Sequence, residues 1–200
     1  MTVLPSLISS DLTNLREEIQ SRGIELAHFD VMDGTFVPEI SFGSFLAKKL
    51  ETGFPNLRLD VHLMVQNPHN QFRYFAQLKN IHRIIFHFEG CNHHIRLINQ
   101  IKDLGIQAGI AINPETSPES LNYLLEYIDC VCVMSVVPGY WGQKFIPASE
   151  KKIIYFDQLR DKNNLDFKIL VDGGVNQELV SKLKAIGADE FVMGSAFFGN

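Results

Sequence analysis

Histidine and aspartate alternate within two short apolar runs in the first third of the chain. One run reads Ala-His-Phe-Asp-Val-Met-Asp-Gly and places His28 two residues before Asp30. The other reads Leu-Asp-Val-His-Leu-Met and places Asp60, His62 and Met64 at the same spacing. Because residues two apart in a β-strand point to the same face, we expect two imidazoles and at least two carboxylates to project into one small volume.

A further carboxylate, Asp172, ends a later apolar run and completes a candidate metal site with His28, Asp30 and His62. Imidazole and carboxylate ligands without sulfur suit a divalent ion such as Zn2+, Fe2+, Mn2+ or Co2+. One inward-facing histidine is more often a hydrogen-bonded core residue, but burying all four groups without a cation would be costly. The set therefore predicts one divalent metal ion in an open site with room for a substrate.

Glycine-rich turns follow the last three apolar runs of the chain. Glycine lets backbone N–H groups approach an anion closely, and in barrels of alternating strands and helices the turns after strands seven and eight commonly bind phosphate. Ordinary tight turns also use glycine, but three such turns favour a phosphate-bearing substrate. The residues expected to contact it are Gly139, Gly142, Gly173, Gly174, Gly194 and Ser195.

Short apolar runs alternate with segments of helical period along the whole sequence. Leu12–Ser21 and Leu97–Leu104 are two of these segments, with apolar residues recurring on one helical face. The apolar runs predict eight strands, at Leu4–Ile8, Leu26–Asp30, Leu57–Met64, Arg83–His87, Gln107–Ile112, Cys130–Val136, Lys168–Asp172 and Glu190–Gly194.

This alternation predicts an α/β fold, a (β/α)8 TIM barrel formed by a single domain that spans residues 1–200. A doubly wound open sheet is the rival, but the GxGxxG motif expected after its first strand is missing. The chain reaches Gly199 soon after the eighth predicted strand, so we expect the helix after strand eight to be missing. His87 and Glu89, at the end of strand four, could either support the metal site or form an ordinary core pair.

The composition limits the classes of partner. The formal net charge of -5 and the pI near 5.8 disfavour binding to nucleic acid or to an anionic membrane surface. No apolar run approaches the roughly 20 residues of a spanning helix, and no secretory signal is apparent. We expect a soluble, cytoplasmic homo-oligomer that binds a small molecule, with Cys91, Cys130 and Cys132 as buried reduced thiols.

Several short motifs follow one another between Pro5 and Ala196. They read Pro-Ser-Leu-Ile-Ser from residue 5, His-Phe-Asp-Val-Met-Asp-Gly from 28 with Phe-Val-Pro from 36, Asp-Val-His-Leu-Met-Val from 60, Val-Met-Ser-Val from 133, Gly-Gln-Lys-Phe from 142, Val-Asp-Gly-Gly-Val from 171 and Gly-Ser-Ala from 194. In this order they closely resemble the ribulose-phosphate 3-epimerase family, and the HxDxMDGxFVP string is highly specific.

The resemblance implies a metal-dependent epimerase of the pentose phosphate pathway that converts D-ribulose 5-phosphate to D-xylulose 5-phosphate. It implies that His28, Asp30, His62 and Asp172 are the metal ligands. Asp30 and Asp172 would also be the two acid/base residues, working through an enediolate that the metal stabilises.

Further substrate contacts implied by the resemblance are Ser6, His62, Met32, Met64 and Met134. Two positions depart from the family pattern, because Trp141 stands where a small residue is usual and Ser135 where threonine is usual. Two alternatives stay open, a D-allulose-6-phosphate 3-epimerase and a non-catalytic sugar-phosphate-binding barrel. A barrel phosphate decarboxylase is disfavoured, because the third strand lacks the lysine of a DxKxxD string.

Overall fold

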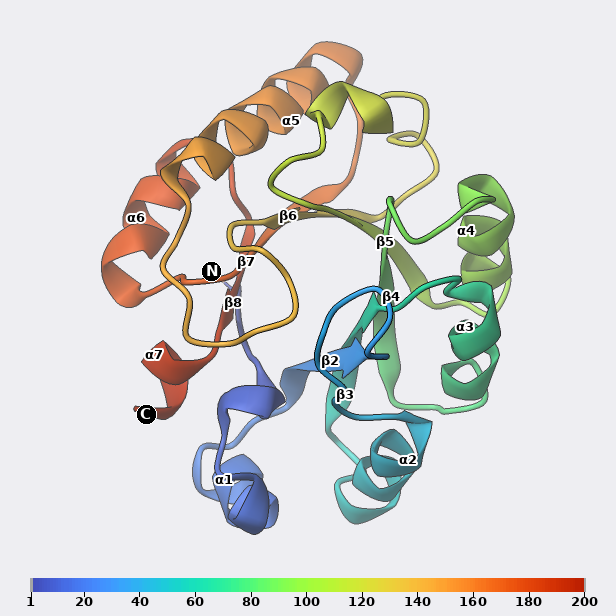
Figure 1. Ribbon diagram of the computed structural model, residues 1–200, viewed down its shortest axis with the longest axis vertical. Coiled ribbons are helices and arrows are strands. Elements are labelled where there is room, and N and C mark those ends of the chain that lie inside the picture. Colours follow the sequence, from blue (N-terminus) through green and yellow to red (C-terminus); the bar gives the residue numbers. More distant parts are fainter. Residues whose placement is uncertain (1, 200) are drawn as a thin grey trace.

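Eight parallel strands form a ring around a central axis, as Figure 1 shows. The computed structural model describes residues 2–199. From β2 to β8 each strand pairs with the next in the sequence, and β8 also pairs with β1. The predicted TIM-barrel class and its eight strands are therefore confirmed. The strands are β1 (Thr2–Pro5), β2 (Leu26–Met32), β3 (Arg58–Met64), β4 (Ile81–His87), β5 (Gln107–Ile112), β6 (Cys130–Met134), β7 (Lys168–Asp172) and β8 (Glu190–Met193).

The first strand is shorter than the predicted Leu4–Ile8. It ends at Pro5, and a 3-10 turn covers Leu7–Ser9, in which the N–H of Ser9 donates to the carbonyl of Ser6 at 3.0 Å. β1 and β2 are the two ends of the sheet. Among the described residues they are joined by an isolated β-bridge between Ser6 and His28. The ring is thus nearly closed, and its seam lies beside the candidate site.

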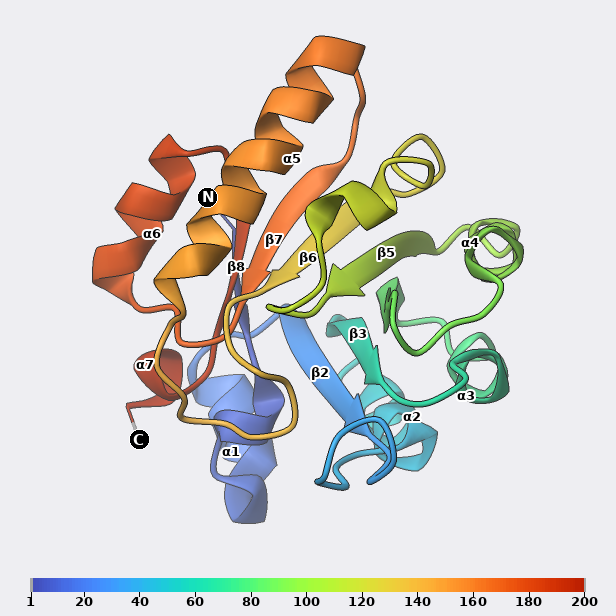
Figure 2. The same cartoon turned by 45° about the horizontal axis from the view of Figure 1, so that its top comes forward.

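Helices cover the outside of the ring (Figures 1 and 2). Where the helix after strand eight was expected to be missing, the described residues form a single four-residue turn of helix, α7, directly after β8. Nothing in residues 2–199 forms a helix both long and apolar enough to cross a lipid bilayer. The helices are α1 (Leu15–Ser21), α2 (Ser44–Gly53), α3 (His69–Phe75), α4 (His94–Lys102), α5 (Glu150–Asn163), α6 (Gln177–Ala185) and α7 (Ser195–Phe198).

Alternating side chains of the strands separate two buried layers. On β3, Val61 and Leu63 pack into the main apolar core outside the ring, whereas Asp60 and His62 face its interior. The remaining interior is filled mostly by small and medium apolar side chains. Cys130 and Cys132 belong to this interior and are free, as predicted, and burial raises the pKa of the Cys130 thiol to about 12.

Candidate active site

Four side chains from β2, β3 and β7 meet inside one end of the ring. Nε2 of His28 lies 3.3 Å from Oδ1 of Asp30 and 3.5 Å from Oδ2 of Asp172. Nδ1 of His62 lies 3.4 Å and 3.2 Å from the same two oxygens. One possible ligand atom of each residue lies within 4.8 Å of those of the other three. The structure thus brings the four predicted metal ligands together, and this donor set fits a shared divalent cation.

Opposite charges set the pKa values in this buried cluster. Burial disfavours the ionised form of Asp30, but His28 and His62 together outweigh it and lower the pKa of the carboxyl. The pKa of Asp172 is also lowered, because hydrogen bonds with His28 and His62 outweigh its burial. Burial alone would lower the pKa of His28, yet Asp30 and two further carboxylates raise it well above its usual value. The site therefore keeps both carboxylates ionised and attracts positive charge.

A chain of charged groups orients His28 from behind. Nδ1 of His28 lies 2.8 Å from Oδ2 of Asp60, and Nε of Arg83 donates to the other oxygen of Asp60 at 2.6 Å. Nη2 of Arg83 donates to Glu190 on β8 at 2.7 Å. With Nδ1 engaged by Asp60, Nε2 of His28 is free to face the cluster. Sequence reasoning placed Asp60 on this face but missed Arg83 and Glu190; the available signal was one arginine in the apolar run Arg-Ile-Ile-Phe.

His62 is supported by a second, mostly neutral chain. Its Nε2 lies 2.9 Å from Nε2 of His87, and Nδ1 of His87 lies 3.3 Å from Glu89. Burial lowers the pKa of His87 to about 4, so this ring is neutral and can accept the proton of His62. Glu89 also accepts from the N–H of Asn113 at 2.8 Å and from the Thr116 hydroxyl. Of the two alternatives left open for His87 and Glu89, these contacts favour support of the metal site.

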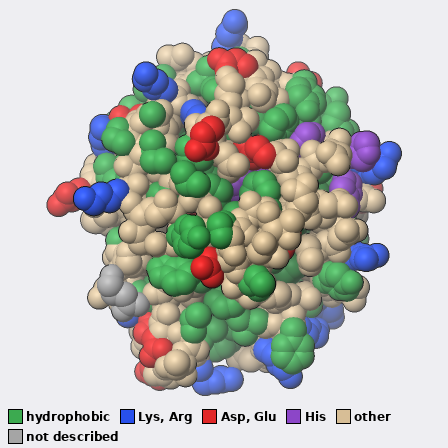
Figure 3. Space-filling model, viewed as in Figure 1, with side chains coloured by type: hydrophobic (Ala, Val, Ile, Leu, Met, Phe, Trp, Pro, Cys, Tyr) green, Lys and Arg blue, Asp and Glu red, His purple; other side chains and the backbone are tan. Residues whose placement is uncertain are grey.

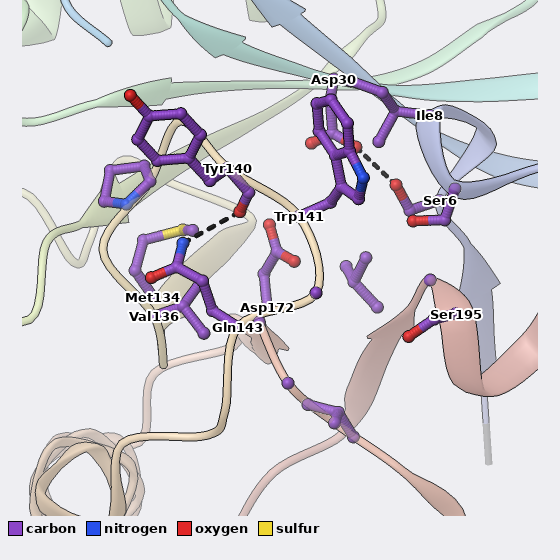
Figure 4. Close-up of a pocket in the computed structure, with 18 of the residues that line it drawn as sticks. Ser6, Ile8, Asp30, Met134, Val136, Tyr140, Trp141, Gln143, Asp172 and Ser195 are labelled. Carbon is purple, nitrogen blue, oxygen red and sulfur yellow. Dashed lines mark hydrogen bonds between the residues drawn. The ribbon is translucent and has the colours of Figure 1, made fainter. Parts of the chain in front are cut away.

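A cavity of about 420 Å3 opens in front of the cluster (Figure 4). Asp30 and Asp172 line it, whereas His28 and His62 are fully buried. Oγ of Ser6 donates to Oδ2 of Asp30 at 2.6 Å. His62, also predicted to contact substrate, is not part of the lining. The other predicted contact residues all line the cavity: Ser6, Met32, Met64, Met134, Gly139, Gly142, Gly173, Gly174, Gly194 and Ser195.

The turns after β6, β7 and β8 build the other end of the cavity. Gly174 has a φ of +65°, and a Cβ there would lie 2.4 Å from the backbone N of Phe145, so the turns after β6 and β7 pack closely. The Ser135 hydroxyl donates to the carbonyl of Asp172 at 2.9 Å and joins the ends of β6 and β7. Among the described residues that line the cavity, Lys144 is the one Lys or Arg. In Figure 3 most Lys and Arg side chains lie toward the edge of the molecule. Glycine turns with one lysine suit a single phosphate group.

Comparison with known families decides where this chain belongs. Residues 2–198 match the family described as "Ribulose-phosphate 3 epimerase family". The chain is a member of the ribulose-phosphate 3-epimerase family. The ribulose-phosphate 3-epimerase of Methanocaldococcus jannaschii is 40% identical over 197 residues, which cover 97% of this chain and 82% of that protein. The Helicobacter pylori enzyme of the same name is 40% identical over 199 residues, covering 99% and 91%. The chain is therefore an isomerase of the epimerase type.

Solved structures of other proteins share the fold of this epimerase. The 3-hexulose-6-phosphate synthase from Salmonella typhimurium superposes with a TM-score of 0.68 at 16% identity, covering 100% of this chain and 92% of that one. The 3-keto-L-gulonate-6-phosphate decarboxylase from Vibrio cholerae gives 0.66 at 13% identity, with 100% and 90% covered. At these identities the likeness establishes the barrel alone.

Proposed function

We propose that this epimerase inverts carbon 3 of D-ribulose 5-phosphate to give D-xylulose 5-phosphate, with one divalent metal ion in its site. The observation that carries the proposal is the meeting of Asp30 and Asp172 at one cavity from β2 and β7, which are not neighbours in the ring. The names of the similar proteins from Methanocaldococcus jannaschii and Helicobacter pylori support this choice of substrate.

Inversion next to a carbonyl requires a proton to leave one face of the carbon and another to return to the opposite face. Asp30 and Asp172 supply one group for each face. The lowered pKa values of both carboxyls favour the carboxylate form. A turnover therefore starts after one of the two has taken up a proton: the ionised carboxyl accepts the C3 proton, and the protonated one donates its proton to the opposite face. The hydroxyl of Ser6 holds Oδ2 of Asp30 and thereby fixes the direction of that carboxylate.

The four clustered residues fit a divalent ion because their ligand atoms converge and carry no sulfur. Such an ion would supply the positive charge that stabilises the enediolate left when carbon 3 loses its proton. Met32, Met64 and Met134 are at most 7% exposed and present an apolar floor to the cavity. This floor keeps water from the carbon while Asp30 and Asp172 exchange its proton.

Replacing Asp172 by Asn tests the two-carboxylate mechanism. We expect exchange of the C3 proton of D-ribulose 5-phosphate with solvent, followed by NMR, to fall by about 1,000-fold. Metal analysis of the wild-type protein should find roughly one divalent ion per chain. Asp166→Asn is the matched control, because Asp166 is exposed ahead of β7, and it should leave exchange unchanged.

Unchanged exchange in a folded Asp172→Asn variant would remove the mechanism. The same assay with D-allulose 6-phosphate shows whether the protein prefers the pentulose or the hexulose phosphate. Absence of exchange with both sugars in the wild-type protein would instead favour a sugar-phosphate-binding barrel.

A further inference from the structure

Trp141, the single tryptophan of the chain, lines the cavity from the loop after β6. Its side chain is 61% exposed, and within residues 2–199 no hydrogen bond or ring contact joins its indole to another residue. In Figure 4 the indole points toward the side of the cavity where Asp30 and Ser6 lie, whereas the Tyr140 ring points the other way. A large aromatic surface left open at the mouth of a cavity is available to cover a bound ligand.

The loop that carries Trp141 is tied down on both sides of it. The side-chain amide of Gln143 donates to the carbonyls of Val137 at 2.6 Å and Tyr140 at 2.9 Å. A Cβ on Gly139 would lie 2.9 Å from Cβ of Val37, so the loop backbone rests directly on the segment after β2. The backbone that carries the indole is therefore held in place at the edge of the cavity.

The proposed substrate is anchored at both of its ends. Carbons 2 and 3 belong at the Asp30 and Asp172 end, and the phosphate belongs at the turns of Gly174 and Gly194. A six-carbon ketose phosphate has one more carbon between these anchors than a five-carbon one. The extra carbon cannot move toward the floor, where Met64 is 3% exposed, so it must bulge toward the mouth and meet the indole.

We propose that Trp141 is a specificity-determining residue that selects five-carbon over six-carbon ketose phosphates. The inference rests on the proposed function, because it assumes a ketose phosphate held by its reacting carbons and its phosphate. The indole packs on the carbon chain of the shorter sugar and blocks the bulge of the longer one.

The test compares kcat/KM for D-ribulose 5-phosphate and D-allulose 6-phosphate in wild type, Trp141→Ala and Trp141→Phe. One methylene in an apolar pocket discriminates by roughly 10-fold or more, so the pentulose preference should fall by about 10-fold in Trp141→Ala. Trp141→Phe should keep most of it, because a ring remains. Phe45→Ala, which removes an aromatic side chain that is 77% exposed and outside the cavity lining, should change neither value.

The outcomes separate the two proposals. If wild type epimerises the pentulose phosphate and Trp141→Ala changes kcat/KM by the same factor for both sugars, the inference fails while the proposed function stands. If wild type epimerises neither sugar, the proposed function fails and the inference fails with it.

Tryptophan fluorescence gives a readout that does not depend on turnover. Because Trp141 is the single tryptophan, its emission should shift to shorter wavelength and resist acrylamide quenching when D-ribulose 5-phosphate saturates the wild-type protein. A Trp141→Phe, Phe45→Trp variant carries its tryptophan outside the cavity and should not respond. Unchanged emission in saturated wild type would overturn the inference.

Discussion

The two histidines of the cluster are oriented by partners of different charge. His28 faces the carboxylate of Asp60, whereas His62 faces the neutral ring of His87. Both arrangements have the same result, because each engages the ring nitrogen that points away from the cluster. Nε2 of His28 and Nδ1 of His62 then face the cluster, where they could hold the proposed cation. The direction of both rings therefore depends on residues that do not touch the cavity.

Glu89 anchors the chain behind His62 and makes part of the stability pH-dependent. Burial raises its pKa, but bonds from His87, Thr116 and the N–H of Asn113 outweigh this and lower it to about 2. A lowered carboxyl pKa adds stability that is complete above the ordinary value of 4.5 and is lost as the pH falls toward 2. Glu89→Gln should therefore reduce the free energy of unfolding by about 2 kcal/mol at pH 7 and by progressively less below pH 4.5.

Urea unfolding of metal-free protein at pH 7, 4 and 3 measures this difference. Glu126→Gln, at an exposed position, should cost little at any of these values. If the loss of unfolding free energy in Glu89→Gln stays constant down to pH 3, the ionised carboxylate is not the stabilising form.

At the scale of elements, the strands are easier to predict from the sequence than the contacts between distant strands or the starts of helices. The period of two on β2 and β3 was sufficient to group His28 with Asp30 and Asp60 with His62, because the alternation is local. The contact of Arg83 with Glu190 joins β4 to β8. It exists only because the ring closes, so no local sequence pattern predicts it. The predicted helix at Leu12–Ser21 begins instead as a 3-10 turn and becomes α-helical from Leu15, which leaves Leu12 47% exposed.

The turn after β7 depends on Gly174 for two reasons. Its φ of +65° disfavours any Cβ, and a Cβ would also lie 2.4 Å from the backbone N of Phe145. Gly23 shares the first property, with a φ of +61°, but a Cβ added there would meet no atom within 4 Å. We expect Gly23→Ala to cost about 1 kcal/mol of unfolding free energy and Gly174→Ala about 3 kcal/mol, measured by urea unfolding. Equal costs would show that the turns after β6 and β7 are not closely packed in solution.

For the whole molecule, closure of the ring is what turns separate strands into one site. Asp30 and Asp172 stand on β2 and β7, and β1 and β8 lie between these strands on the shorter way around the ring. The seam between β1 and β2 carries the isolated bridge of Ser6 with His28, and the Ser6 hydroxyl reaches Asp30 across it. The hydrogen bond that holds a proposed acid/base residue therefore also joins the two ends of the sheet.

Arg83 ties opposite walls of the barrel through its interior. It is 1% exposed and binds Asp60 on β3 and Glu190 on β8, at 2.6 Å and 2.7 Å. Removing one partner of a buried ion pair leaves an uncompensated charge, so Arg83→Met should lower the unfolding free energy by about 3 to 5 kcal/mol. Arg58→Met, at an exposed position on β3, should change it by less than about 0.5 kcal/mol.

Two further measurements show how the Arg83 variant fails. Adding Asp60→Asn to Arg83→Met removes one of the two carboxylates that have lost their partner, so part of the unfolding free energy should return. The double variant should nevertheless bind a divalent metal more weakly than wild type by calorimetry, because Asp60 no longer orients His28 as a carboxylate. An unchanged unfolding free energy in Arg83→Met would mean that the arginine is not buried between the walls. An unchanged metal affinity in the double variant would mean that Arg83 and Asp60 do not support the metal site.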